Sequence, residues 1–398
     1  MRWSSAVAQE PQLEEAITNA AAEITSRMDG VEIDLAVVFV SHHFSTRYQD
    51  VLVLLSDALH HTHLVGCSAG GVIGGGQEVE RRPGLSITAA HLPEVTITPI
   101  CLTANHLPDA DASPTAWSDA TGIPLDPISH FILLADPFSF PAPQFLAGLD
   151  YAYPRSVKVG GLASGARQPG GNALYLDDAI SHEGLVGVAL RGNIAVDTIV
   201  AQGCRPVGET MRITRAAGSI LLELEDKPAL ELIQELIYSL TEHDRNLARQ
   251  ALFVGVVMNN MTTEPRAGEF LIRNIVGIDA ESGAIAVGEK LEDGQLIQFH
   301  VRDADSSAAD LDLMLSRFAE GNLARNARGA LLFSCLGRGM HLYGHQDHDT
   351  NRFQEYISDV PLGGFFCNGE IGPVAGTTHL HGFTSSFAIF APSHQEKH

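Results

Sequence analysis

The feature that most constrains the fold is an internal repeat of an apolar segment followed at a distance by a glycine-rich turn. In the first copy, Val37–Ser41 closes a near-continuous apolar run, and Val65-Gly66 leads into the glycine-rich stretch Cys67–Gly76. In the second copy, Phe131–Ala135 and Val159-Gly160 occupy the same places without a gap. A run that is apolar on both faces is typical of a buried strand, and ungapped self-similarity indicates repeated architecture. We therefore expect a repeated strand-helix-strand-turn-strand unit.

A third copy of the same unit closes the sequence, with a few inserted residues. Its expected elements are a strand at Ala330–Cys335, a helix near Asn351–Ile357, a turn at Gly363–Glu370 and a last strand at Phe387–Phe390. For this copy, chance similarity of apolar pattern is the alternative. Strand-helix-strand units imply parallel pairing, and ligands bind at the carboxyl ends of such strands. We expect an α/β fold of mixed, largely parallel sheets, with the three turns lining a common cleft if the copies face one another.

The region between the second and third copies, Gly192–Arg328, has a different pattern. Strand-like segments surround an expected turn at Arg205–Gly208. Pro228 suits a first helical turn, and Ala229–Arg249 and Ser306–Arg328 have helical spacing. No low-complexity linker is present, so the boundary between domains is placed near Pro228.

Net charge argues against nucleic-acid and membrane partners, and the cysteine content indicates a reducing compartment. The 398 residues include 25 basic and 48 acidic side chains, for a net charge of −23. Such a field repels nucleic acid and anionic membranes. An odd number of widely spaced cysteines, five, reads as free thiols in a reducing compartment. The sequence has no signal-peptide pattern and no run of about 18 apolar residues. We expect a cytoplasmic protein without a nucleic-acid or membrane partner.

The first glycine turn contains two candidate nucleophiles. Gly66-Cys67-Ser68-Ala69-Gly70 satisfies G-x-S-x-G, the nucleophile elbow of α/β-hydrolases, which needs a helix directly after the turn. The glycines that follow, beginning at Gly71, disfavour that helix. Cys67 is either a reactive strand-end thiol or a small buried residue. We favour a ligand-facing turn and a protein that is not an enzyme; a hydrolase or thiol enzyme using Ser68 or Cys67 stays the second hypothesis. Without a Walker lysine or a G-x-G-x-x-G helix, no nucleotide cofactor is expected.

Charged and polar residues after the third-copy strands suggest an amino-acid site. An arginine fork at Arg338 suits a carboxylate, and Glu370 suits an amino group. The alternative is a salt bridge between these two side chains. Asn368 could add a directional hydrogen bond. His379 and His381 share one face of a strand-like stretch, so one of them could face the cleft.

A histidine-rich segment follows Arg338. His341, His345 and His348 stand near Asp347 and Asp349, and histidine with carboxylate can bind zinc or iron. Because the segment lacks apolar rhythm, solvated loop residues are favoured over a metal site. We expect no metal.

Together these residues resemble the FIST family. The resemblance rests on Val65–Gly71, Gly203–Gly208, Lys227–Leu230, Phe333–Gly339, Gly364–Pro373 and His381–Ser386. It implies a FIST N-terminal domain over 31–227 and a FIST C-terminal domain over 228–392. An N-terminal helix over 1–30 is expected from the amphipathic spacing of Gln12–Arg27. The resemblance also implies a sensory domain of signal transduction that binds a small ligand such as an amino acid. No F-box, kinase or chemotaxis module is evident, so the output partner would be a separate protein.

The predicted ligand site draws on the three turns and their neighbours. It comprises Gly66, Cys67, Ser68, Gly70, Gly71, Ser164, Arg338, Asn368, Glu370 and His381. The expected function is non-enzymatic binding of an amino acid or similar small carboxylate, without a cofactor. A third hypothesis is an interaction scaffold whose acidic surface meets a basic protein.

Overall fold

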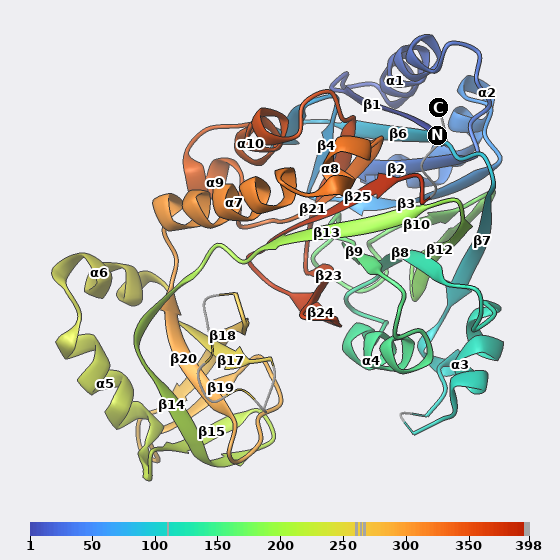
Figure 1. Cartoon of the computed structure of the whole chain (residues 1–398). Coiled ribbons are helices and arrows are strands. Elements are labelled where there is room, and N and C mark those ends of the chain that lie inside the picture. The colour runs from blue at the N-terminus through green and yellow to red at the C-terminus, as the bar shows by residue number, and fades with distance from the viewer. Residues whose placement is uncertain (110, 259–261, 263–264, 266–267, 394–398) are drawn as a thin grey trace. The chain divides into compact units, whose positions relative to one another are not determined.

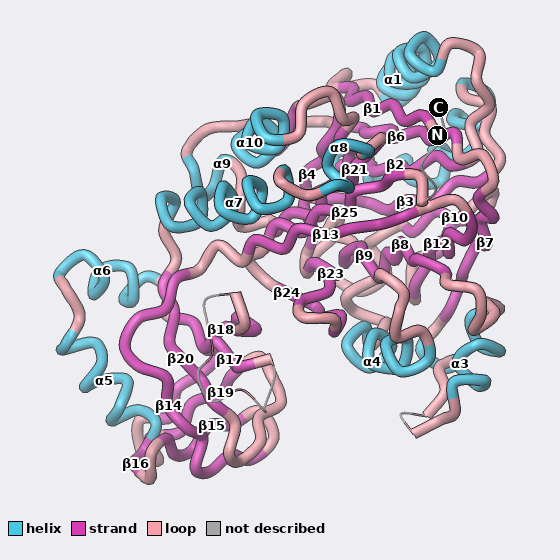
Figure 2. The backbone as a smooth tube through the Cα atoms, in the orientation of Figure 1, coloured by secondary structure: helices cyan, strands magenta, loops and turns pink. Residues whose placement is uncertain are grey.

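The computed structural model describes residues 1–109, 111–258, 262, 265 and 268–393 (Figures 1 and 2). They form two compact units. Unit 1 consists of Met1–Val200, Asp312–Leu380 and Thr384–His398, and unit 2 of Ala201–Leu311 and His381–Phe383. The chain passes from unit 1 into unit 2 after residue 200 and returns to unit 1 at residue 312.

Unit 1 combines strands with helical segments. They are β1 (Arg2–Ala8), α1 (Leu13–Met28), β2 (Leu35–Ser41), η1 (His42–Asp50), α2 (Val51–Ala58), β3 (His63–Ala69), β4 (Gly71–Gly74), β5 (Gln77–Glu80), β6 (Leu85–His91), β7 (Val95–Leu102), η2 (Ala104–His106), α3 (Pro114–Thr121), β8 (Ser129–Ala135), α4 (Ala142–Ala152), β9 (Lys158–Leu162), β10 (Leu174–Leu176), β11 (Ala179–Ser181), β12 (Leu185–Gly192) and β13 (Ala195–Ala201). After unit 2 follow α8 (Asn322–Asn326), β21 (Gly329–Cys335), α9 (Met340–Tyr343), α10 (His348–Tyr356), β22 (Leu362–Cys367), β23 (Glu370–Val374), β24 (Thr377–His381) and β25 (Ser385–Ala391).

Three six-stranded sheets in unit 1 are built around the three copies of the repeat. Each contains one parallel pair joined through helical turns: β2–β3, β8–β9 and β21–β22. Each also contains an antiparallel strand beside the first member of that pair: β6, β12 and β25. The mixed α/β fold and its three-copy repeat are therefore confirmed. The sheets are mixed and less parallel than expected, because the pairs β1–β6, β3–β10, β7–β12, β4–β22 and β9–β23 are antiparallel.

Short hairpins exchange between the three sheets in a closed cycle. The hairpin β4–β5, which follows the first copy's turn, pairs with β22 of the third copy. The hairpin β10–β11 of the second copy pairs with β3 of the first. Strand β23 of the third copy pairs with β9 of the second. Each copy thus completes the sheet of another copy, which fixes the three glycine-rich segments close together.

Alternating residues of the central strands belong to different cores. In β2, Leu35, Val37 and Phe39 join a central core to which all three sheets contribute. The residues between them face a core with α1 and α2, which lie over this sheet in Figure 1. In β8, Ile132 and Leu134 join the central core, whereas their neighbours face α3 and α4. Burial on both faces explains why these strands read as continuous apolar runs.

One glycine recurs in the second parallel strand of each copy because no side chain fits there. A Cβ atom on Gly66, Gly160 or Gly364 would lie 2.1, 1.8 or 1.9 Å from a carbonyl oxygen of the neighbouring strand. Gly160 and Gly364 also have φ angles of +147° and +148°, which L-residues rarely adopt. The glycine of the sequence repeat is thus a packing requirement of the parallel strand pair.

The described residues of unit 2 form a closed antiparallel sheet, helices α5 and α6, and the first part of α7. Its elements are β14 (Arg205–Ala217), β15 (Ile220–Leu224), β16 (Lys227–Pro228), α5 (Ala229–Ser239), α6 (Glu242–Gln250), β17 (Phe253–Val257), β18 (Phe270–Asp279), β19 (Ala284–Val287) and β20 (Leu296–Val301); α7 (Ala304–Ala319) leads from unit 2 into unit 1. The order β14-β20-β17-β18-β19-β15 closes because β15 also pairs with β14.

Three sequence expectations in this region are wrong in detail. Arg205–Gly208 lies within β14 and pairs with β20, so it is no turn. The expected helix Ala229–Arg249 is broken into α5 and α6, since Leu240 is extended and Thr241 caps the second helix through a 3.1 Å bond from the backbone N–H of Asp244. The helix expected over Ser306–Arg328 is likewise two helices, α7 and α8.

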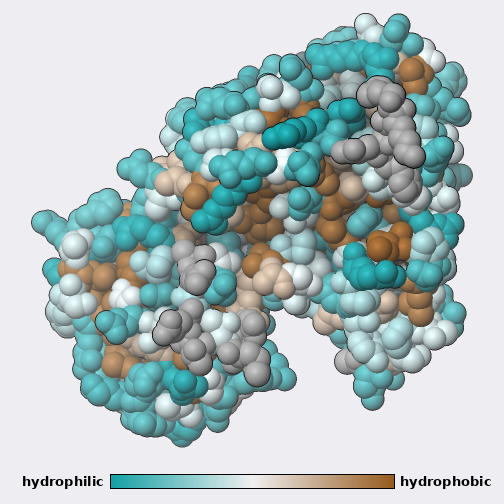
Figure 3. Space-filling model, in the orientation of Figure 1, coloured by the Kyte–Doolittle hydropathy of each residue, from teal (hydrophilic) through white to brown (hydrophobic). Residues whose placement is uncertain are grey.

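On the face drawn in Figure 3, hydrophilic residues dominate the outer edges. Among the described residues, no helix is both long and apolar enough to cross a membrane.

Candidate functional site

The three glycine-rich segments meet in unit 1, and Ser164 joins them. Its hydroxyl accepts a 2.8 Å bond from the N–H of Gly70 in the first copy and donates to the carbonyl of Phe366 in the third. Its own N–H donates to the carbonyl of Ser68 at 3.2 Å. Ser164 is 9% exposed. This predicted site residue is therefore a buried link between the three copies.

Cys67 and Ser68 lie inside strand β3 and not in a turn. The strand continues to Ala69 because it pairs with β2 on one side and β10 on the other. Gly70 then bends the chain directly into β4, with no helix. Neither Cys67 nor Ser68 is exposed, and burial raises the pKa of the Cys67 thiol. The surroundings thus lack the exposure and the helix that a nucleophile elbow uses.

The hydroxyl of Ser68 takes part in a buried polar chain. It donates to Oδ1 of Asn172 at 3.1 Å and accepts from the N–H of Ala173 at 3.0 Å. Nδ2 of Asn172 donates in turn to Oδ1 of Asp136 at 2.9 Å. These bonds tie the second-copy hairpin to the first-copy strand, so Ser68 has a structural role. Gly66 faces the backbone of β2 and is also structural.

Arg338 is paired with Asp349 and not with Glu370. Its Nε lies 2.9 Å from Oδ2 of Asp349 and its Nη2 lies 3.1 Å from Oδ1, while Nη2 also donates to the Tyr343 hydroxyl at 2.6 Å. Arg338 is 0% exposed. Glu370 is also buried, and its Oε2 accepts from the N–H of Thr384 at 3.2 Å. Arg338 is therefore enclosed by protein rather than open to a ligand.

Burial alone would raise the pKa of Asp349, but Arg338 and the hydrogen bonds from His348 and Ser385 hold it below its usual range. Burial alone would lower the pKa of Arg338, which Asp349 nevertheless raises. The pair is therefore a buried ion pair in which both groups are charged.

The histidine-rich segment divides between the surface and this buried pair. His348 and Asp349 begin helix α10, and both are buried, so the expectation of solvated loop residues is wrong for these two. His348 stacks on Tyr343 with ring centroids 3.5 Å apart and lies 3.0 Å from Oδ1 of Asp349. His341 and His345 are exposed. No cluster of three or more metal-ligating side chains occurs in the described part of the chain.

The remaining predicted residues lie in different places. Asn368 is exposed, and its backbone N–H donates to the carbonyl of Leu162 at 3.1 Å. His381 is 4% exposed and belongs to unit 2. Arg338, Glu370 and His381 are thus buried, whereas Asn368 is exposed.

A pocket of about 450 Å³ opens where the first and third copies' strands end, and we call it the strand-end pocket. It is lined by His42, His43, Gly70, Gly71, Glu80, Arg81, Arg167, Leu336, His341 and Phe366. His42 follows β2, Gly70 follows β3 and Leu336 follows β21. Of the predicted site residues, Gly70 and Gly71 line this pocket. Its position matches the rule that α/β proteins bind ligands at the carboxyl ends of strands.

The strand-end pocket combines both signs of charge with apolar surface. Arg81 and Arg167 are exposed cations, whereas Glu80 is partly buried. Oε1 of Glu80 accepts the N–H of Met340 at 2.8 Å. Burial raises the pKa of Glu80, while Met340 and Arg81 oppose this shift. Leu336 is 40% exposed and supplies apolar surface. The pocket is thus suited to a small molecule with two opposite charges.

Two adjacent histidines form one wall of the strand-end pocket. Their rings lie 4.1 Å apart between centroids. Burial, and then the nearby ring of His42, lowers the pKa of His43. His43 is consequently neutral at pH 7 and can accept as well as donate a hydrogen bond.

The sequence did not single out Glu80, Arg81 or Arg167. The sequence feature that could have identified them is their position: Glu80 and Arg81 follow the first glycine-rich segment, and Arg167 follows the second. The pair His42-His43 directly follows the strand β2. A search for polar residues just beyond each predicted strand would have found His42 and His43, whereas Glu80, Arg81 and Arg167 stand further along the chain.

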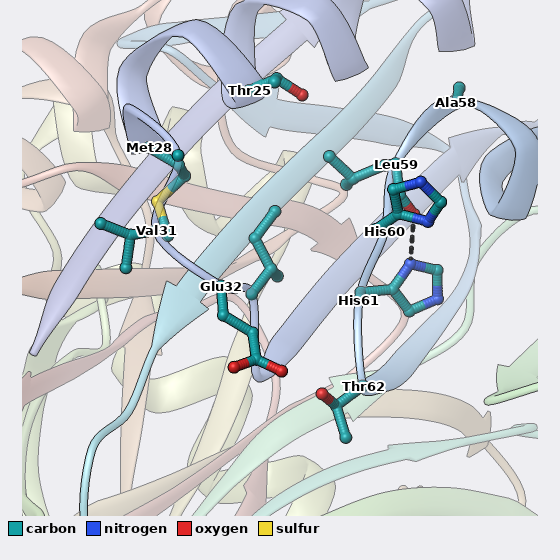
Figure 4. A pocket seen from close by; sticks show the side chains of 11 residues that line it. Thr25, Met28, Val31, Glu32, Ala58, Leu59, His60, His61 and Thr62 are labelled. Carbon is teal, nitrogen blue, oxygen red and sulfur yellow. Dashed lines mark hydrogen bonds between the residues drawn. The ribbon is translucent and has the colours of Figure 1, made fainter.

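A second hollow lies at the amino end of β2, far along the strand from the glycine turns (Figure 4). It measures about 430 Å³ and is lined by the ends of α1 and α2 and the loops that follow, including Met28, Glu32, His60 and His61. Nδ1 of His61 lies 2.7 Å from the carbonyl of Leu59, the contact dashed in Figure 4. None of the predicted site residues lines this hollow.

A buried glutamate beside the strand-end pocket gives a pH prediction. Glu78 is 1% exposed, and its Oε1 accepts the N–H of Thr350 at 2.9 Å. Burial, and then the charge of Asp349, raises the pKa of Glu78 to about 8. Between its unfolded pKa of about 4.3 and 8, the folded state binds a proton that the unfolded state lacks. Stability therefore falls as pH rises through this window.

Glu78→Gln removes that loss. We compare the free energy of unfolding of the variant with that of wild type at each pH. This difference should be more favourable to the variant at pH 8 than at pH 5, by more than about 1 kcal/mol. Urea unfolding at both pH values measures this change, with Glu23→Gln on the solvent-facing side of α1 as control. Parallel pH curves for wild type and Glu78→Gln would show that Glu78 ionises normally.

Comparison with known proteins assigns the chain to a family. A family model for the FIST N domain matches residues 34–227, and one for the FIST C domain matches residues 229–373. The chain belongs to the FIST family. FIST domains are generally sensory, ligand-binding domains of signal transduction.

Full-length relatives of this FIST protein occur in mycobacteria. Uncharacterized protein Rv0628c of Mycobacterium tuberculosis is 36% identical over 98% of this chain and 100% of its own length. Uncharacterized protein Mb0898c of Mycobacterium bovis is 34% identical over 98% of this chain and 99% of its own. F-box only protein 22 of Homo sapiens is 27% identical over 25% of each chain.

Proposed function

We propose that this FIST protein is a cytoplasmic, non-enzymatic sensor that binds a small amino acid in the strand-end pocket and signals to a separate output protein. The observation that carries this proposal is the composition of the pocket, in which two arginines and a glutamate surround apolar surface. The pocket lies at the carboxyl ends of strands from two copies of the repeat.

Each part of an amino acid has a complementary group in the pocket. Arg81 and Arg167 provide guanidinium donors for the α-carboxylate, which arginine binds through paired hydrogen bonds. Glu80 provides a carboxylate for the ammonium group. Leu336 and Phe366 provide apolar surface for a side chain. A volume of about 450 Å³ is within the range of small-molecule sites.

Arginine substitutions test the proposal. Arg81→Ala and Arg167→Ala should each weaken amino-acid binding about tenfold or more, because a charge-assisted hydrogen bond to the carboxylate is lost. Isothermal titration calorimetry of the purified protein with the twenty amino acids measures this. Arg82→Ala is the matched control, since Arg82 is exposed beside Arg81 but bonds to Gln346 at 3.0 Å and does not line the pocket.

Glu80→Gln separates an amino-acid site from a site for simple carboxylates. It should weaken an amino acid while leaving the corresponding carboxylate without an amino group nearly unchanged. If no amino acid binds the folded wild-type protein at millimolar concentration, the proposal fails. Equal losses in the Arg81, Arg167 and Arg82 variants would place binding elsewhere.

A further inference from the structure

The strand-end pocket carries an excess of positive charge, unlike the chain as a whole. Among the described residues that line it are two arginines, Arg81 and Arg167, and one carboxylate, Glu80. The other polar side chains of the lining are the histidines His42, His43 and His341. The whole chain has 48 acidic and only 25 basic side chains. The pocket therefore favours a ligand with more negative than positive charge.

The carboxylates near the pocket do not offset this excess. Asp349 is neutralised by its ion pair with Arg338. Burial, and then the charge of Asp349, raises the pKa of Glu78 to about 8, so this carboxyl group is largely protonated at pH 7. Asp347 does not line the pocket, and its Oδ1 accepts the N–H of Glu78 at 2.6 Å. A bound anion would therefore meet mainly the two arginines.

Neither pocket arginine is committed to a carboxylate of the protein. Both are exposed, and within the described part of the chain neither forms a hydrogen bond or an ion pair. Arg81 and Glu80 attract each other without forming an ion pair. The exposed Arg155, in contrast, pairs with Asp126. Both guanidinium groups of the pocket thus keep their donors for a ligand.

The two guanidinium groups and the carboxylate have separate anchor points. Arg167 follows the second copy's glycine-rich segment, whereas Glu80 and Arg81 follow the first copy's hairpin. Oε1 of Glu80 is held by the N–H of Met340 at 2.8 Å. Arg81 has a φ angle of +58°, a left-handed conformation that residues other than glycine seldom adopt and that clusters at ligand sites.

One guanidinium group is sufficient for one carboxylate, because the two can form a pair of parallel hydrogen bonds. The second arginine is then left for a second carboxylate. We propose that the strand-end pocket is specific for an acidic amino acid, aspartate or glutamate, whose two carboxylates bind Arg81 and Arg167 and whose ammonium group binds Glu80. Because the ligand occupies the same pocket, this specificity rests on the function proposed above.

Matched ligands test this specificity. Isothermal titration calorimetry of the full-length protein compares glutamate with glutamine and aspartate with asparagine, at low ionic strength, where exposed charges are least screened. The members of each pair differ in one carboxylate. We expect at least one acid to bind about tenfold or more tightly than its amide, because the amide lacks a charge-assisted hydrogen bond. Equal affinities within both pairs would overturn the specificity and leave the proposed function standing. If no amino acid binds the folded protein, the proposed function fails as well.

Arginine variants show which group recognises the second carboxylate. In either Arg81→Ala or Arg167→Ala, the preference for the acid over its amide should disappear, while the other variant should weaken both ligands alike. Arg82→Ala, the matched control outside the pocket, should keep both the affinities and the preference. A preference for the acid that persisted in both pocket variants would overturn the proposal, since the second carboxylate would then be recognised elsewhere.

Discussion

Replacing Asp349 with alanine is expected to lower the free energy of unfolding by about 3–5 kcal/mol, because it leaves the Arg338 charge buried and unpaired. Arg338 is 0% exposed and Asp349 1% exposed. Asp349 also accepts hydrogen bonds from Ser385 and, at 3.4 Å, from Ser334. Its loss therefore breaks a network and not one contact. Urea unfolding at pH 7, followed by circular dichroism, measures the change.

The same pair predicts how stability changes in acid. The folded pKa of Asp349 lies below its unfolded value of about 3.9. The stabilisation by the pair is therefore present above about pH 4 and is lost as pH falls through the folded pKa. In Asp349→Ala, this part of the acid sensitivity should be absent.

Glu23→Ala is the matched control for Asp349→Ala. Glu23 pairs with Arg27 at 2.5 Å on the surface of α1, with side chains 40% and 51% exposed. A pair of this kind contributes about 0–1 kcal/mol. If Asp349→Ala cost no more than Glu23→Ala, then Arg338 would have to reach solvent or another anion, contrary to its burial.

The partner of Arg338 could not be predicted from the sequence. Arg338 and Glu370 both follow strands of the third copy, so linear position made them equivalent candidates for a ligand. The partner of Arg338 stands eleven positions away, at the start of α10. Which carboxylate an arginine meets depends on helix placement, and neither apolar periodicity nor glycine spacing encodes it.

The fold was more predictable than the site, because apolar pattern reports burial. Continuous apolar runs identified β2, β8 and β21, each buried on both faces. Strand β1 was missed because Arg2–Ala8 mixes serine with apolar residues at a sheet edge. The exchange of hairpins was also missed, since a strand such as β4 can pair with any edge of suitable shape, and its partner β22 is far along the chain.

Replacing the repeated glycine with alanine should lower the free energy of unfolding more than adding a methyl group elsewhere in unit 1. A Cβ atom on Gly160 would lie 1.8 Å from the carbonyl oxygen of Leu133, and one on Gly364 would lie 1.9 Å from that of Leu332. Both obstacles are backbone in a central parallel pair, so no side chain can move aside. With φ near +147° and +148° as well, we expect each variant to lose more than about 4 kcal/mol, the range reserved for severe core disruption.

Gly66→Ala and Gly122→Ala separate the two causes of that loss. Gly66 has the steric conflict, 2.1 Å from the carbonyl oxygen of Val38, without a positive φ. Gly122 has a φ of +71° with open space around it, so alanine there should cost only about 1 kcal/mol. We expect Gly66→Ala to resemble Gly160→Ala and Gly364→Ala in urea unfolding or soluble yield. If all three were instead as stable as Gly122→Ala, the parallel pairs would tolerate separation, and the shared glycine would not be required by the three-copy packing.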